Sequence, residues 1–146
     1  MTVPHLIPAM EASTAPAAFA AVRAHGLRLS TARRLLLQAL FDAEAPLSAE
    51  QLAGDGDVAS AYRNLEVLEG LGLVTHVHLG HGPGRYQPAG RPREFVVCEG
   101  CGDVSPLAPG AVDAVRAAVL DALGYRARFT HFPLAGLCPV CAVEDN

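Results

Sequence analysis

Residues 57–79 read DVASAYRNLEVLEGLGLVTHVHL, and within this stretch the spacing of apolar residues changes from a helical period to the alternation of a strand. Asp57 is expected to cap a helix that runs to about Leu71. The apolar face of this helix comprises Val58, Ala61, Leu65, Leu68 and Leu71. Residues 73–79 then alternate like a strand, so the sequence predicts a helix that leads directly into a strand.

Further helices precede this stretch and a hairpin completes it. Residues 80–84 (GHGPG) are typical of a turn, and residues 85–87 begin a return strand. Upstream, a short helix is expected over residues 17–24, and Ser30 can cap another helix whose apolar face comprises Ala32, Leu35, Leu36, Ala39 and Leu40. Residues 48–51 (SAEQ) match a capping box that opens a short helix. Helices followed by a hairpin predict a winged helix, whose last helix enters the major groove of DNA.

The predicted last helix carries side chains that suit base recognition. Ser60, Arg63 and Asn64 are expected to face outward, with Tyr62 at the margin. Arginine can pair with guanine, asparagine with adenine, and an aromatic ring can touch a thymine methyl group. Ser60 can hold a phosphate. The alternative is an ordinary solvated helix face with a tyrosine half in the core, and these residues alone leave both interpretations open.

Composition restricts the class of protein without deciding its function. The net charge is -4, and the chain contains no lysine, so its overall charge does not predict DNA binding and any DNA contact depends on a local patch. The chain contains no run of 18 or more apolar residues, so no membrane-spanning helix is predicted. Residues 1–16 lack the features of a signal peptide and are interpreted as a flexible tail. We therefore expect a cytoplasmic protein.

The second half of the chain is expected to form a separate small domain. The predicted division is a winged-helix domain over 17–88, a linker over 89–93 and an α/β domain over 94–146, which gives an α+β protein overall. In the last of these, strands are expected over 94–97, 103–107 and 125–132, and a helix from Pro109 to Leu123.

Two CxxC pairs predict a metal site in this second domain. Cys98 and Cys101 form one pair, and Cys138 and Cys141 form the other. Four thiolates satisfy tetrahedral zinc and leave no position open for water or substrate, so we expect one structural zinc ion per chain and no enzymatic activity or small-molecule substrate. The alternatives are two disulfides, one redox-active CxxC, or a zinc ribbon that binds other proteins.

Together these segments resemble the ferric uptake regulator family of metal-responsive repressors. The resemblance rests on the order and spacing of the segments GLRLS (26–30), LSAEQL (47–52), SAYRNL (60–65), GLV (72–74), CEGCG (98–102) and GLCPVC (136–141). It implies a homodimer that binds palindromic operators in double-stranded DNA, with Tyr62 and Arg63 at the positions that contact DNA. It also implies a structural zinc on the four cysteines and a second, regulatory metal near the domain hinge.

The sequence departs from the family at this second metal. Residues 91–97 contain no histidine where family members carry several, and Gln87 stands at the position of a carboxylate. Two other sets of residues are candidates for a divalent zinc, nickel, iron or manganese ion. One set is His76, His78 and His81 in the predicted hairpin, and the other is Glu94, Asp113 and His131. These histidines can instead face solvent, DNA or a dimer core, and the carboxylates can be ordinary surface groups. A regulator of this family that has lost metal sensing is therefore the main rival interpretation.

Overall fold

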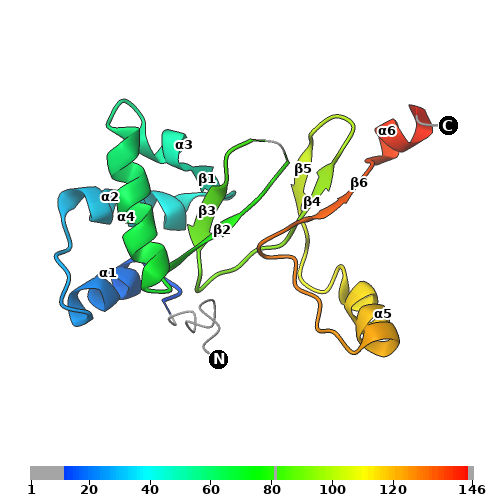
Figure 1. The fold of residues 1–146 in the computed structure, drawn as a ribbon, viewed down its shortest axis with the longest axis horizontal. Coiled ribbons are helices and arrows are strands. Elements are labelled where there is room, and N and C mark those ends of the chain that lie inside the picture. The colour runs from blue at the N-terminus through cyan, green and yellow to red at the C-terminus, as the bar shows by residue number, and fades with distance from the viewer. Residues whose placement is uncertain (1–11, 81, 145–146) are drawn as a thin grey trace. The chain divides into compact units, whose positions relative to one another are not determined.

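A computed structural model of the chain describes residues 12–80 and 82–144, and it divides into two compact units (Figure 1). The first unit contains the chain up to His76 together with Gly84–Pro92, and the second contains Val77–Pro83 and the chain from Arg93 onward. Each unit has its own cluster of buried apolar side chains. Within the described residues, no helix is both long enough and apolar enough to cross a membrane.

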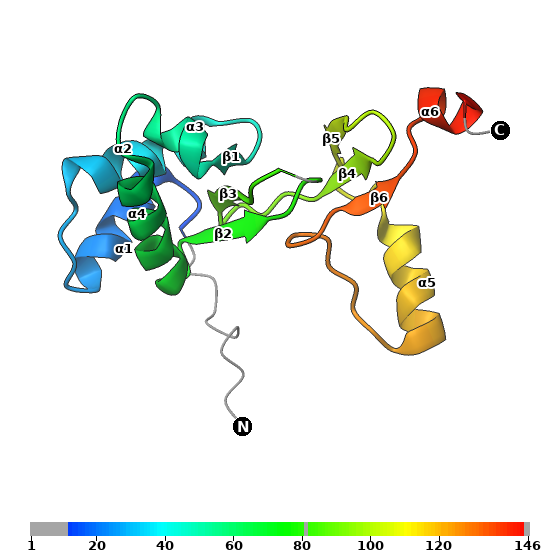
Figure 2. The ribbon, with the colours of Figure 1, turned by 45° about the horizontal axis from the view of Figure 1, so that its top comes forward.

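The first unit is built on the helices α1 (Ala15–Ala24), α2 (Thr31–Asp42), α3 (Ala49–Ala53) and α4 (Val58–Gly70). Figure 2 shows these helices gathered beside a small sheet. Each of the predicted caps is present. The Ser30 hydroxyl accepts a hydrogen bond from the backbone N–H of Arg33, Ser48 and Gln51 form the capping box, and Asp57 caps α4. These caps satisfy N–H groups that the first turn of a helix leaves without partners.

The buried face of α2 differs from the predicted one. Leu36, Leu37, Leu40 and Phe41 are buried, whereas Ala32 and Leu35 are exposed, Leu35 by 64%. The run of three leucines at 35–37 allows two apolar stripes that differ by a rotation of roughly 100° about the helix axis. The stripe containing Phe41 is the one that packs into the core with α1 and α4. A phenylalanine has more apolar surface to bury than the Ala32 of the other stripe.

Part of the predicted tail and part of the predicted linker belong to the first unit. The tail prediction over 1–16 is wrong for residues 12–16, because Ala12 is only 3% exposed and α1 begins at Ala15, and residues 1–11 lie outside the described part of the chain. The linker predicted over 89–93 is packed at its start. The N–H of Ala89 donates to the Leu73 carbonyl at 3.0 Å, and Nη2 of Arg91 donates to the Phe41 carbonyl at 2.6 Å.

A three-stranded sheet completes the first unit. Its strands are β1 (Leu47–Ser48), β2 (Val74–Val77) and β3 (Arg85–Pro88), in the order β1-β3-β2. The first strand was not predicted, because two residues are too few to show an alternating pattern. It pairs antiparallel with β3, with Leu47 opposite Tyr86. Helices followed by a hairpin confirm the predicted winged-helix order.

The second unit is a mixed sheet with two helices. Its strands β4 (Phe95–Cys98), β5 (Val104–Pro106) and β6 (Leu134–Gly136) lie in the order β5-β4-β6, with β5 antiparallel and β6 parallel to β4. The helices are α5 (Asp113–Leu123) and α6 (Pro139–Glu144). The core comprises Val77, Leu79, Phe95 and Val97.

Two predictions for the second unit are wrong. The helix begins at Asp113 rather than at Pro109, because Gly110 has a φ of +82°, which a right-handed helix excludes. Residues 125–132 are not a strand, and the nearest strand is β6. Their backbone groups do not form the regular hydrogen bonds of a sheet and bond to separate partners. The Phe129 N–H donates to Glu94, and the His131 carbonyl accepts from the His78 N–H at 2.9 Å.

Candidate nucleic-acid interface and metal sites

Arg63 and Ser60 lie on the first half of α4 in a short hydrogen-bonded chain. Nη2 of Arg63 donates to the Ser60 hydroxyl at 2.9 Å, and that hydroxyl donates to Oδ2 of Asp57 at 2.7 Å. The Arg63 side chain is 69% exposed and lies 3.8 Å from the same carboxylate. The hydrogen bond from Ser60, together with the Ala59 N–H and the charge of Arg63, lowers the pKa of Asp57. The guanidinium is therefore accessible to an external phosphate or base edge, while an acidic group stands next to it.

Tyr62 is 40% exposed, and its hydroxyl donates to Oε1 of Glu50 on α3 at 3.2 Å. Partial desolvation and this hydrogen bond raise the pKa of the Tyr62 hydroxyl. The contact fixes the ring at the junction of α3 and α4. Tyr62 and Arg63 thus present an aromatic ring and a guanidinium on adjacent positions of α4.

Asn64 is half-buried, whereas the sequence led us to expect an outward side chain. Its Oδ1 accepts a hydrogen bond from Nε of Arg33 on α2 at 3.2 Å. Arg33 also donates through Nη1 to the Arg28 carbonyl at 2.8 Å. Arg33 therefore ties α4 to α2 and to the loop before it. This role was not predicted, because nothing in the sequence around Arg33 indicates a partner 31 residues away.

The four cysteines converge in the second unit, at the end of β4 and the start of α6. Their sulfur atoms all lie within 4.8 Å of one another, and Sγ of Cys101 lies 3.9 Å from Sγ of Cys138. Zinc–sulfur bonds of about 2.3 Å place the sulfurs of a tetrahedral site about 3.8 Å apart, whereas a disulfide requires about 2.05 Å. All four cysteines are free thiols. The donor set fits structural zinc and does not fit the alternative of two disulfides.

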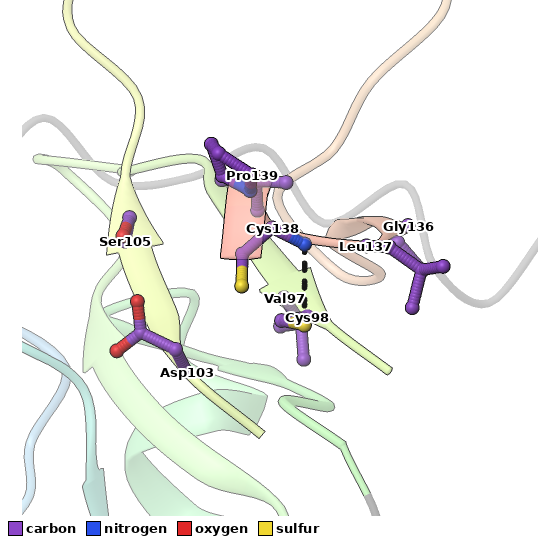
Figure 3. A pocket seen from close by; sticks show the side chains of 10 residues that line it. Val97, Cys98, Asp103, Ser105, Gly136, Leu137, Cys138 and Pro139 are labelled. Atoms are coloured by element: carbon purple, nitrogen blue, oxygen red, sulfur yellow. Dashed lines mark hydrogen bonds between the residues drawn. The ribbon is translucent and has the colours of Figure 1, made fainter. Parts of the chain in front are cut away.

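Backbone hydrogen bonds prepare one of these thiols for ionisation. Sγ of Cys98 accepts from the N–H groups of Cys101 at 3.4 Å and Cys138 at 3.2 Å, the second of which is drawn in Figure 3. These bonds lower the pKa of Cys98 to about 6. Hydrogen bonding to Cys138 and Cys98 raises the pKa of Cys141 to about 12. Four neighbouring thiols do not all ionise by themselves, and a divalent cation supplies the charge that stabilises four thiolates.

The turn beneath the cysteines leaves no room for a side chain at Gly100. A Cβ atom there would lie 2.9 Å from Sγ of Cys141. Figure 3 shows the adjoining hollow between β4, β5 and β6, where Asp103 and Ser105 lie opposite Cys138 and Pro139. The close approach at Gly100 explains the glycine inside the first CxxC pair.

The candidate histidines have different surroundings. In the first unit, Nδ1 of His76 pairs with Oε1 of Glu69 on α4. In the second unit, the ring of His78 stacks on Phe132 with centroids 5.4 Å apart and lies edge-on to His131 at 5.0 Å. His78 and His131 offer ring nitrogens within 4.8 Å of each other. His81 lies outside the described residues.

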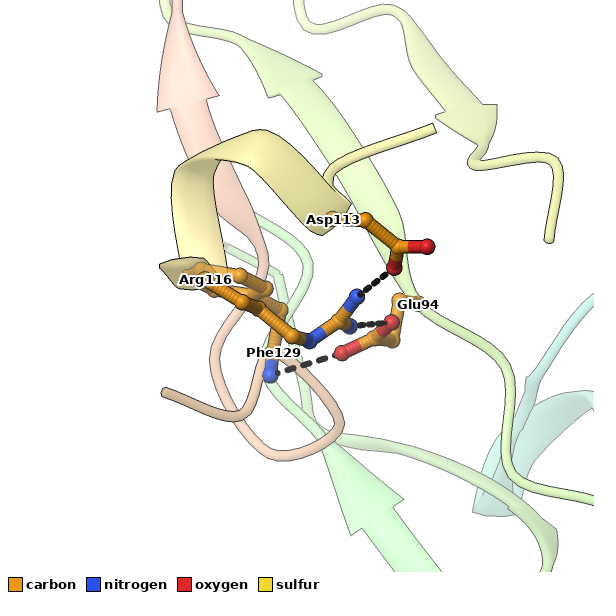
Figure 4. A network of polar contacts seen from close by, with 4 residues as sticks. All are labelled: Glu94, Asp113, Arg116 and Phe129. Carbon is orange, nitrogen blue, oxygen red and sulfur yellow. Dashed lines mark hydrogen bonds and ion pairs between the residues drawn. The ribbon is translucent and has the colours of Figure 1, made fainter. Parts of the chain in front are cut away.

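Glu94 and Asp113 both contact Arg116, which was not among the candidate site residues predicted from the sequence. Figure 4 shows both carboxylates directed toward the guanidinium of Arg116, with Nη2 bonded to Oε1 of Glu94 and Nη1 lying 3.4 Å from Oδ1 of Asp113. Among the described residues, Glu94, Asp113 and His131 do not bring three ligand atoms together. The donor set predicted from these residues therefore does not fit a metal ion.

Comparison with known proteins agrees with this architecture. A profile of the ferric uptake regulator family matches residues 24–131. The chain belongs to this family. It is 24% identical over 128 residues to the peroxide operon regulator of Bacillus subtilis, covering 83% of this chain and 88% of that protein. It is also 24% identical over 130 residues to the ferric uptake regulation protein of Campylobacter jejuni, covering 82% and 83%.

Solved structures of family members share the fold. The ferric uptake regulator of Helicobacter pylori superposes with a TM-score of 0.68 at 18% identity, covering 88% of this chain and 94% of that one. This confirms the predicted α+β architecture of a winged helix followed by a small α/β domain. The family match ends at residue 131, before Cys138 and Cys141, so the four-cysteine site rests on the structure of this chain itself.

Proposed function

We propose that this ferric uptake regulator family protein is a cytoplasmic, metal-responsive transcriptional regulator that represses genes by binding palindromic operators as a homodimer. The observation that carries the proposal is the exposed pair Tyr62 and Arg63 on the last helix before the wing strands. An arginine on such a helix can reach O6 and N7 of guanine in the major groove. Ser60 adds a hydroxyl to the same surface.

A homodimer is supported by apolar side chains that one chain leaves in water. No residue of α5 is buried, although the helix is rich in alanine, valine and leucine. Large exposed apolar side chains of α5 and of the segment that follows it in the chain include Val115 (42%), Leu120 (51%), Leu123 (68%), Tyr125 (72%) and Phe132 (62%). Exposed apolar surface of this kind marks an interaction site, and two-fold symmetry of the protein matches a palindromic operator.

In this proposal the four cysteines hold one structural zinc ion per chain, which joins β4 to α6. His78 and His131 supply nitrogen ligands to a second, regulatory divalent cation, because their rings already lie together in the second unit. Imidazole suits zinc, nickel and iron better than manganese. His76 stands two residues before His78 in the sequence and is the third residue to test.

The experiment is a titration of the zinc-loaded protein against the DNA upstream of its own gene, at fixed salt and at controlled free zinc, nickel, ferrous iron and manganese. We expect one metal to tighten binding by tenfold or more, which is about 1.4 kcal/mol. His78→Ala and His131→Ala should abolish that response while leaving the cysteine zinc in place. His76→Ala decides whether His76 contributes.

Arg63→Ala should weaken operator binding by about 1–3 kcal/mol if Arg63 contacts a base. Arg23→Ala, an exposed arginine at the end of α1, is the matched control and should change binding little. A protein-interaction module would bind no operator, and neither substitution would change its binding to a protein partner.

A second candidate is a regulator of the same family that binds DNA without sensing a metal. Two observations favour it: Gln87 is a buried neutral amide (3% exposed) at a family carboxylate position, and Arg116 stands between Glu94 and Asp113. Specific operator binding that ignores every metal tested, in both wild type and the histidine variants, would establish this alternative.

A further inference from the structure

Arg116, in the first turn of α5, lies between two carboxylates that the proposed function leaves unused. Its guanidinium bonds to Glu94, which directly precedes β4, and reaches Asp113 on its own helix at 3.4 Å (Figure 4). Two carboxylates that converge repel one another unless a cation lies between them. Here that cation is the guanidinium of Arg116, which is part of the chain itself.

Each oxygen of Glu94 already accepts one hydrogen bond. Oε1 accepts from Arg116, and Oε2 accepts from the N–H of Phe129 at 3.0 Å. The guanidinium carbon lies 5.5 Å from the centroid of the Phe129 ring. The side chains of Glu94 and Arg116 are only 22% and 30% exposed, so the pair is partly sheltered from water and salt.

A divalent ion at this position would meet the positive guanidinium at close range. It would also have to share each Glu94 oxygen with a hydrogen bond that the oxygen already accepts. A fork of fixed N–H donors matches carboxylate geometry and does not depend on the supply of a free ion.

We propose that the guanidinium of Arg116 takes the place of a divalent metal ion between Glu94 and Asp113, so that a cation built into the chain permanently cross-links the second unit there. Arg116, on the first turn of α5, bonds to Glu94 just before β4. The segment 124–133 is attached through Phe129, whose N–H donates to Glu94 and whose ring lies beside the guanidinium. His131 follows Phe129 by two residues. On the proposed function, Arg116 is therefore also a positioning residue for the segment that carries a regulatory ligand.

The test uses the full-length, zinc-loaded protein and Mn²⁺, which prefers carboxylate oxygen ligands. Melting temperature is measured with and without Mn²⁺ for wild type, Glu94→Gln, Arg116→Ala and the double variant E94Q/R116A. The informative quantity is the Glu94-dependent shift. It is the change in melting temperature on adding Mn²⁺ to wild type minus the change in Glu94→Gln, and likewise for Arg116→Ala minus the double variant. This subtraction cancels the effect of Mn²⁺ bound elsewhere, at the histidines for example.

We expect no Glu94-dependent shift in wild type. Arg116→Ala should melt several degrees lower, and Mn²⁺ should restore part of that loss only while Glu94 is present. A Glu94-dependent shift in wild type would overturn the proposal, since the carboxylates would then bind a metal despite Arg116. An Arg116→Ala protein that melts like wild type, or that Mn²⁺ does not restore, would overturn it as well.

If Arg116→Ala does not fold, Arg116→Lys is tested in its place. A lysine keeps the positive charge but lacks the forked N–H donors of the guanidinium. A folded Arg116→Lys protein with no Glu94-dependent shift supports the proposal, and an unfolded or Mn²⁺-responsive one contradicts it. None of these readouts involves DNA. Loss of operator binding would therefore contradict the proposed function and leave this inference unaffected. A Glu94-dependent Mn²⁺ shift in wild type would contradict this inference and leave the proposed function unaffected.

Discussion

Nε of Arg33 donates a hydrogen bond to Oδ1 of Asn64 at 3.2 Å and so ties α2 to α4. This contact gives Asn64 a role inside the protein. Arg33→Ala and Asn64→Ala should each lower the free energy of unfolding, and a double-mutant cycle should give a coupling of about 1 kcal/mol. Urea denaturation measures it. A coupling near zero, combined with a base-specific loss of operator binding in Asn64→Ala, would instead support the base contact expected from the sequence.

Asp57 places a negative charge 3.8 Å from Arg63 on the surface proposed to face DNA. Asp57→Asn retains a residue that caps helices equally well and removes the charge. We expect tighter DNA binding by several-fold, because less repulsion opposes the phosphates, with little change in thermal stability. Titration of operator DNA at low and moderate salt measures the effect. Glu66→Gln, on an exposed position of the same helix, is the control, and an equal gain there would make the effect one of net charge alone.

Removing one thiol should release the zinc. Cys98→Ser and Cys138→Ser are each expected to lose the metal and to lower the melting temperature of the second unit, because binding a structural zinc contributes to the free energy of folding. Metal analysis together with differential scanning calorimetry tests both effects. Ser105→Ala, in the adjoining hollow, should keep one zinc ion per chain. Cysteine variants that also kept it would contradict the four-thiolate site.

Gly90 is packed directly against the N-terminal segment. A Cβ atom at this position would lie 2.1 Å from the Ala12 carbonyl oxygen, so Gly90→Ala must displace backbone. We expect a loss of about 1–3 kcal/mol in the free energy of unfolding, the usual result of overpacking. Gly70→Ala is the matched control, because nothing lies within 4 Å of its added Cβ and it sits at the end of α4. If both substitutions were equally mild, the packing of Ala12 against Gly90 would be in error.

The ion pair of Glu94 should make stability depend on pH. The hydrogen bond from Arg116 lowers the pKa of Glu94 below its ordinary 4.5 in the folded protein. A lowered folded pKa stabilises the protein above the unfolded value, and this contribution is lost as the pH falls through the folded value. Unfolding measured from pH 6 downward should therefore show a steeper loss in wild type than in Glu94→Gln. Parallel curves of unfolding free energy against pH would mean that the ion pair does not contribute to the pH dependence of stability. Zinc content must be measured at each pH, because acid also protonates the thiolates.

Local patterns predicted most of the helices and their caps. The hydroxyls of Ser30 and Ser48 and the carboxylate of Asp57 bond to N–H groups two or three residues away, so a short window of sequence contains both partners. The two CxxC pairs are a similar case, since the spacing within each pair already positions two thiols. The chemistry of the thiols then predicts that the pairs meet at one metal ion.

The sequence by itself therefore determined the helices and hairpin of the first unit, the caps at Ser30, Ser48 and Asp57, and the four-cysteine site of this ferric uptake regulator family protein. Tertiary structure decided which stripe of α2 is buried, that Asn64 turns toward Arg33, and that Arg116 occupies the space between Glu94 and Asp113. The partners in those pairs lie 31 and 22 residues apart. Short-range periodicity and capping leave such pairs unspecified, because they form only when the packing of apolar faces brings distant side chains together.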